Sequence, residues 1–107
     1  MDKETAKQEL LNIFTQEKKV VSNHYAYMSK NGKNMTITFY IYKSYNDKIN
    51  INKYINILLG FEIDNKHEGI KFKVENNLNI YAGDMIINAL SQCLYGDAKH
   101  LKVENEI

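Results

Sequence analysis

The stretch from Met35 to Lys43 alternates strictly between two kinds of side chain, and this pattern constrains the fold more than any other feature of the sequence. Successive side chains of a β-strand point to opposite faces of a sheet, so the pattern predicts a strand with one buried and one outward face. The set expected in the core is Met35, Ile37, Phe39 and Ile41. The set expected on the outward face is Thr36, Thr38, Tyr40 and Tyr42.

A second strand is predicted immediately before this one. The segment from Val20 to Met28 is rich in β-branched and aromatic residues, which favour strands. Asn31-Gly32 follows as a turn signal, so the two strands are expected to form a hairpin. Farther along, residues 61 to 63 suit a brief strand, and the alternation of residues 70 to 74 predicts another, with Ile70, Phe72 and Val74 on its buried side.

Three helices are expected around these strands. The segment from Thr5 to Lys18 separates apolar from charged residues as an amphipathic helix does, and Asp2 or Thr5 could cap it. Apolar residues recur at helical spacing from Ile51 to Leu59, and Gly60 then suits a left-handed helix end. A last helix is predicted from Asp84, as its N-cap, to Gly96.

The predicted order is therefore helix, β-hairpin, helix, one or two strands, and helix. This order indicates an α+β fold with a small antiparallel sheet and helices packed on it. A chain of 107 residues with 44% hydrophobic residues can build one core, so a single domain is expected over residues 1–107. Its core is predicted to span residues 5–97, with a C-terminal tail at 98–107.

Composition restricts the kind of partner that the chain can bind. The net charge is +1, so no overall field attracts nucleic acid or an anionic membrane, and a nucleic-acid partner is disfavoured. All 14 basic residues are lysines, and the joint abundance of Lys, Asn and Ile is typical of AT-rich coding. Cys93 has no partner for an internal disulfide, and no apolar stretch is long enough to span a bilayer, so a reducing cytoplasm is expected.

No catalytic, metal or cofactor site is predicted. His24, His67 and His100 lie far apart without the spacing of metal ligands. Ser91 and Cys93 lack the elbow and the oriented base that nucleophilic catalysis needs. We therefore expect a binding protein and not an enzyme.

The feature that rises above this background is the outward face of the sheet, where tyrosines and lysines are expected together. Tyrosine rings can stack on nucleobases at about 1–3 kcal/mol per base, and lysines can meet phosphates. The alternative is that another element covers this face, or that its rings pack across strands or between protomers. The candidate ligand-binding residues are Tyr25, Tyr27, Lys30, Lys33, Tyr40, Tyr42, Lys71 and Lys73.

Two segments resemble a family of small uncharacterised proteins common in tailed phages, prophages and other mobile elements. The segment from Ser29 to Tyr40 looks like that family's Ser-Arg-Ser-Gly-Met-Ser-Arg hairpin and the alternating strand after it. The segment from Gly69 to Asp97 is similar to its Gly-Ile-Lys-Val strand, loop and Leu-Ser…Leu-Tyr-Gly-Asp helix. With the helix end at Leu58-Leu59-Gly60, the likeness extends over roughly residues 20 to 100.

This chain is a divergent member by that comparison. The family's Gly-Gly-Cys-Gly-Met-Asp-Met-Gly loop corresponds to residues 76 to 83, which keep only the final glycine. Lys30 and Asn34 stand where the family's hairpin has arginines. A different ligand, or none, is therefore expected if those residues contact a ligand in the family.

The resemblance implies an accessory protein of a phage or mobile element, acting in the cytoplasm of a bacterial host, and such proteins often disable host defence. Our leading expectation is an anti-defence protein that sequesters a small, for example cyclic, nucleotide immune signal as a homo-oligomer. The alternative is a protein–protein inhibitor of a defence effector such as a CRISPR nuclease, with the tyrosines as interface anchors.

Overall fold

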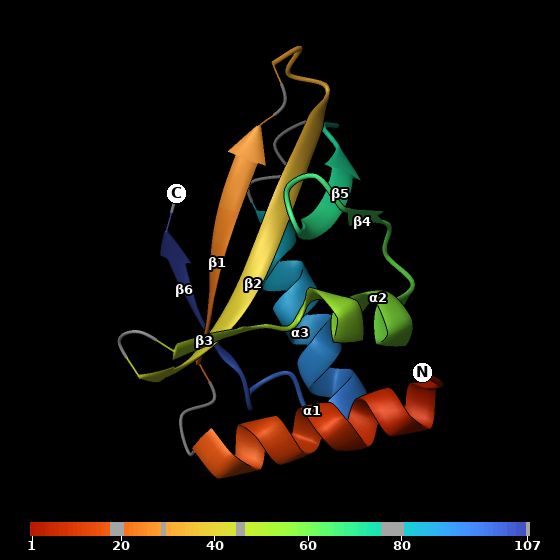
Figure 1. Ribbon diagram of the computed structural model, residues 1–107, viewed down its shortest axis with the longest axis vertical. Helices are drawn as coiled ribbons and strands as arrows, with labels where there is room; N and C mark the ends of the chain where they lie inside the picture. Colours follow the sequence, from red (N-terminus) through yellow and green to blue (C-terminus); the bar gives the residue numbers. More distant parts are fainter. Residues whose placement is uncertain (18–20, 29, 45–46, 76–80, 107) are drawn as a thin grey trace.

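The computed structural model describes residues 1–17, 21–28, 30–44, 47–75 and 81–106 (Figure 1). Within these ranges, three helices and six strands follow one another. They are α1 (Lys3–Glu17), β1 (Val21–Met28), β2 (Asn34–Ser44), β3 (Asp47–Asn50), α2 (Asn52–Leu59), β4 (Ile63–Asp64), β5 (Gly69–Lys73), α3 (Ala82–Tyr95) and β6 (Lys102–Glu106). The predicted α+β class is confirmed.

The predicted hairpin forms the centre of the sheet. β1 and β2 pair antiparallel from Ser22 opposite Ile41 to Met28 opposite Met35. Gly32 has a φ of 68° in the connecting turn, and the backbone N–H of Lys33 donates to Asn31 Oδ1 at 2.9 Å. A glycine in the left-handed conformation beside an asparagine is typical of a tight turn.

β2 is long enough to serve two partners on its other edge. Its first half pairs antiparallel with β5, and its second half pairs antiparallel with β3 from Tyr40 onward, with an irregularity between Tyr42 and Ser44. The remaining strands extend the sheet to the order β4-β5-β2-β1-β6. The sheet therefore divides beside β2, and α2 follows directly from β3 at this division (Figure 1).

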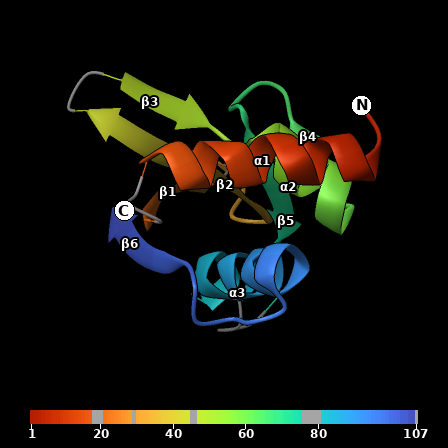
Figure 2. The same ribbon diagram turned by 90° about the horizontal axis from the view of Figure 1, so that it is seen from below.

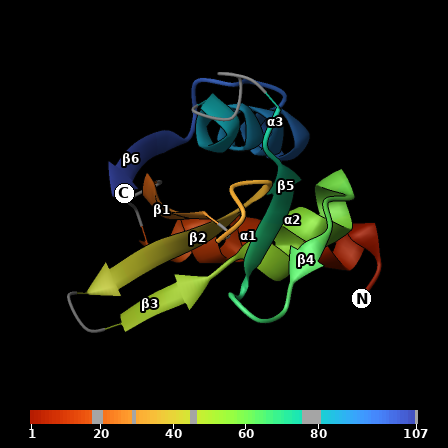
Figure 3. The same ribbon diagram turned by 90° about the horizontal axis from the view of Figure 1, so that it is seen from above.

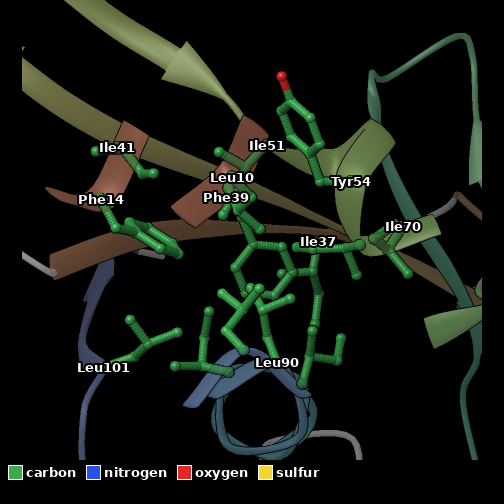
Figure 4. Packing of buried hydrophobic residues seen from close by; sticks show 14 of the residues in the cluster. Leu10, Phe14, Ile37, Phe39, Ile41, Ile51, Tyr54, Ile70, Leu90 and Leu101 are labelled. Carbon is green, nitrogen blue, oxygen red and sulfur yellow. The ribbon is translucent and has the colours of Figure 1, made fainter. Parts of the chain in front are cut away.

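The helices pack against the apolar face of the curled sheet. Seen along β2, α3 lies in the hollow of the curl, while α1 runs across one end of it (Figures 2 and 3). Phe39 from β2, Leu10 and Phe14 from α1 and Leu90 from α3 meet in one cluster and are almost completely buried (Figure 4). The predicted buried set of β2, Met35, Ile37, Phe39 and Ile41, is in this core, as expected.

The helix ends follow the sequence in most respects. The backbone N–H of Thr5 donates to Asp2 Oδ1 at 2.7 Å, so Asp2 caps α1 and not Thr5. Gly60 and Gly96 end α2 and α3 in the left-handed conformation, as predicted. The prediction for Asp84 was wrong, because α3 begins at Ala82 and Asp84 lies in its first turn, where a carboxylate still suits the helix dipole.

Two strands lie outside the predicted order. β3 lies between the predicted hairpin and the second predicted helix, and the expected tail contains β6, with Leu101 buried just before it. β6 pairs parallel with β1, so the sheet is mixed and not purely antiparallel. Both segments are short and polar, and their pairing depends on edges of β1 and β2 that only the folded sheet presents.

Candidate functional site

The outward face of the sheet was the predicted site, and Tyr40 is its best described member. Tyr40 lies opposite Asn50 of β3, is partly exposed, and has Lys48 Nζ 4.5 Å from the centre of its ring. A cation over a tyrosine ring at this distance is an attractive contact. The register puts Tyr25 opposite Thr38, Tyr27 opposite Thr36 and Tyr42 opposite Lys48, and the side chains of these three tyrosines lie outside the described part of the structure.

The turn from Asp64 to Glu68 covers the middle of this face. Thr36 and Thr38, both expected to face outward, are only 4% and 8% exposed. Thr36 Oγ1 donates to Asp64 Oδ2 at 2.7 Å, and Thr38 Oγ1 lies 3.4 Å from the backbone oxygens of both His67 and Glu68. The outward face is therefore not one continuous surface.

The four predicted lysines lie on the far side of this turn from Tyr40. Lys71 and Lys73 are exposed on β5, opposite Thr36 and Asn34, and Lys71 Nζ is 3.8 Å from a carboxylate oxygen of Glu62. Lys30 and Lys33 are exposed at the hairpin end. At about 3.3 Å per residue, the positions opposite Lys71 and Lys73 are about 13 and 20 Å along β2 from Tyr40. The structure thus separates the predicted lysines from Tyr40.

Asp64 organises the covering turn. Its carboxylate accepts hydrogen bonds from the Thr36 hydroxyl and from the backbone N–H of Lys66 at 3.0 Å, and it lies 2.9 Å from His67 Nδ1. The side-chain contact with His67, followed by that with Thr36, lowers the pKa of Asp64 to about 2. Asp64 is therefore ionised at neutral pH and holds the turn against β2.

The backbone oxygen of Glu68 is a second fixed point. It accepts hydrogen bonds from the side-chain amides of Asn50, at 3.2 Å, and of Asn52. Asn52 Oδ1 in turn accepts the backbone N–H of Phe39 at 3.0 Å, and Asn50 Oδ1 accepts that of Asn52 at 2.9 Å. Glu68 has a φ of 54°, which is unusual for a residue other than glycine. These amides fasten the turn to both β2 and the start of α2.

Between this turn and α2 lies an open cleft of about 680 Å³. Asn52 and Asn56 follow each other at the i, i+4 spacing that puts two side chains on one side of a helix, and so do Lys53 and Ile57. The opposite wall comes from β4 and the turn. The lining residues are Asn50, Asn52, Lys53, Asn56, Ile57, Ile63, Asn65 and Glu68.

The side chains that line this cleft can form hydrogen bonds, and their charges sum to zero. Asparagine amides supply both donors and acceptors, Ile57 and Ile63 supply apolar contact, and Lys53 and Glu68 carry opposite charges. This site was not predicted from the sequence, because the many asparagines were attributed to coding bias. The spacing of Asn52 and Asn56 was the available signal.

Two of the polar residues weighed for catalysis or metal binding, Ser91 and His100, make contacts within the fold. Ser91 is completely buried and donates to the backbone oxygen of Asp97 at 2.5 Å. The ring of His100 stacks on Tyr95, with ring centres 4.6 Å apart, and the side chain of His24 lies outside the described part of the structure. Among the residues that the structure describes, no three His, Cys, Asp or Glu side chains gather as a metal site would require.

Comparison with known proteins adds no identification. No protein-family model, no curated protein and no solved structure matches the chain. The resemblance to the phage-borne family therefore stays a prediction that rests on the hairpin and the last helix. Within the described ranges, no helix combines the length and the apolar character that crossing a membrane needs.

Proposed function

We propose that this protein is a non-enzymatic binding protein that captures a small nucleotide in the asparagine-lined cleft. In the setting that the family resemblance implies, it would act in the cytoplasm of a bacterial host, as a homo-oligomeric anti-defence protein of a phage or mobile element. The observation that carries the proposal is the cleft itself. Its volume of about 680 Å³ lies within the range of about 300–1,000 Å³ typical of sites for small molecules.

The side chains around the cleft suit the parts of a nucleotide. Amides can bond in pairs to the edge of a purine, and Ile57 and Ile63 can lie against its ring. Lys53 lines the cleft and could meet a phosphate, whereas Lys48, which lies over the ring of Tyr40, is not part of the lining.

Capture without turnover fits this set of side chains. Amides do not gain or lose protons near neutral pH, so asparagines can hold a ligand but cannot act as general acids or bases. Among the described residues that line the cleft, Glu68 is the one acidic side chain. Binding one ligand per site and keeping it intact is therefore the behaviour that we expect.

Thermal unfolding in the presence of a panel of cyclic and linear nucleotides tests this proposal. A ligand at a hundred times its dissociation constant stabilises the folded protein by about 2.7 kcal/mol, which is a readily measured shift. The bound nucleotide should be recovered unchanged after release. A panel in which every nucleotide leaves the unfolding temperature unaltered would contradict nucleotide capture.

The second candidate is a protein–protein inhibitor of a host defence effector, and the outer side of α3 favours it. Tyr81 precedes α3 and Met85 lies in its first turns, and each is 59% exposed. They are four positions apart, the spacing at which helical residues form one stripe. Large exposed side chains of these two types are enriched at protein interfaces. If Tyr81→Ser with Met85→Ser abolishes the biological effect while nucleotide binding persists, this second candidate is preferred.

A further inference from the structure

The cleft between α2 and the β4–β5 turn carries a more specific inference about its ligand, and this inference rests on the nucleotide-binding function proposed above. We propose that the cleft binds an adenine nucleotide with a single phosphate group, holding the base on the amides of Asn56 and Asn65 and the phosphate on Lys53. Nucleotides with more phosphates are bound no better.

The wall of the cleft is fixed before any ligand enters. Asn52 is 4% exposed and uses both ends of its amide inside the protein, accepting from Phe39 N–H and donating to the backbone oxygen of Glu68. Asn50 makes a parallel pair of bonds, to the N–H of Asn52 and the same Glu68 oxygen. These two asparagines are anchors, and a site held in advance loses less conformational freedom on binding.

The more accessible amides are those of Asn56 and Asn65. Asn56 is partly exposed and donates one amide hydrogen to the backbone oxygen of Phe61, which orients its side chain. An amide group has two hydrogens and an oxygen with two lone pairs, so bonding capacity remains for a ligand. Asn65 is exposed on the opposite wall. An amide that donates and accepts side by side matches N7 and the exocyclic amine of adenine.

The charge in the cleft limits the number of phosphates. Lys53 and Glu68 are both exposed, and they are the charged members of the lining. Lys53 Nζ lies 4.9 Å from the centre of the Tyr54 ring, which is outside the lining, so this flexible side chain has to turn into the cleft to meet a phosphate. One ammonium group can meet one phosphate, but further phosphates would meet the carboxylate of Glu68 without a matching cation in the lining.

Isothermal titration calorimetry of the full chain with adenosine, AMP, ATP, ribose and inorganic phosphate tests this inference. AMP is expected to bind about tenfold more tightly than adenosine, the usual size of one charged hydrogen bond, and ATP no more tightly than AMP. Ribose and inorganic phosphate are expected to give no binding. Affinity that rises from AMP to ATP, or ribose binding equal to that of adenosine, would overturn the inference.

Four exposed positions provide variants that should leave the fold unchanged. Lys53→Met should reduce AMP binding to the level of adenosine without changing adenosine binding, while Lys73→Met, at the far end of the sheet, should change neither. Asn65→Asp should weaken both ligands by about tenfold, whereas Asn88→Asp on α3 should have no effect. Circular dichroism of each variant checks its folding.

These outcomes separate the two proposals. If no nucleotide binds at all, the proposed function is wrong. If nucleotides bind but Lys53→Met and Asn65→Asp behave as the original protein does, nucleotide capture survives and the cleft is not its site. If Lys73→Met is the variant that loses binding, the ligand lies instead on the lysines that the sequence singled out.

Discussion

Replacing Gly69 with alanine should destabilise the protein, although the same change at an ordinary strand position would stabilise it by about 0.4–1 kcal/mol. Gly69 is the first residue of β5 and lies beside β2, under the turn that forms one wall of the cleft. An added Cβ would be 2.5 Å from Thr36 Cγ2, 2.7 Å from the Ile37 backbone oxygen and 2.7 Å from Thr38 Oγ1. These distances are too short for unbonded atoms, so something must move.

The size of the loss follows from what has to move. The Ile37 oxygen belongs to the backbone of β2, and Ile37 pairs with Ile70, the residue after Gly69. Moving this oxygen away from the added Cβ would therefore separate β2 from β5. Overpacking of this kind costs about 1–3 kcal/mol. Rotating the Thr38 hydroxyl away from the His67 and Glu68 oxygens costs about 1 kcal/mol more. We expect Gly69→Ala to lower the free energy of unfolding by about 2–4 kcal/mol.

Equilibrium urea unfolding measures this loss, with a lower midpoint and an unchanged slope as the expected result. The matched variant is Gly69→Ala combined with Thr36→Ser, which removes the nearest methyl group and keeps the hydroxyl that binds Asp64. This double variant should recover part of the stability. A Gly69→Ala protein as stable as the original, or more stable, would show that the turn does not press on β2 as described.

Four further predictions concern the core, the anchors, acid stability and composition of the purified protein. Phe39→Ala and Leu90→Ala should each lower the free energy of unfolding by about 2–5 kcal/mol in urea, and losses below about half a kcal/mol at both positions would mean that the faces are reversed. Asn52→Ala should cost about 1–3 kcal/mol, because it removes the buried hydrogen bond from the Phe39 N–H to Asn52 Oδ1, and amide hydrogen exchange at Phe39 should accelerate. The pKa of Asp64 is lowered from 3.8 to about 2, so its contribution to stability is present above pH 3.8 and is lost as the pH falls towards 2. Asp64→Asn should remove this part of the acid dependence of unfolding. If the variant loses stability with falling pH as the original protein does, the role given to Asp64 is wrong. Elemental analysis should find no stoichiometric zinc, and prolonged incubation should leave every nucleotide of the panel intact.

The sequence predicted the centre of the fold because local patterns determine it. The alternation from Met35 to Ile41 fixes which face of β2 belongs to the apolar core, and the hairpin glycine and the helix-ending glycines have the left-handed conformations that their positions require. β3 and β6 were missed because their sequences are short and polar. They form strands because the edges of β1 and β2 are available for pairing, and those edges exist only in the folded sheet.

The candidate site was predicted less well, and the reason lies in one turn. Thr36 and Thr38 follow the outward half of the alternation, but the missing side chain of Gly69 lets the Asp64–Glu68 turn approach and cover them. That approach separates Tyr40 from Lys71 and Lys73 and creates the cleft beside α2. A contact between residues about thirty positions apart leaves no periodic signal in the sequence.

The location of the bound nucleotide tests the central claim most directly, and amide NMR chemical-shift mapping measures it. Side-chain amides of asparagine give their own signals, so the walls of the cleft can be observed separately from the backbone. On titration with AMP, we predict the largest shifts at the side chains of Asn56 and Asn65 and at the backbone of Lys53. Shifts concentrated at Lys30, Lys33 and Lys73 would contradict binding in the cleft, and a spectrum that does not change would contradict nucleotide capture.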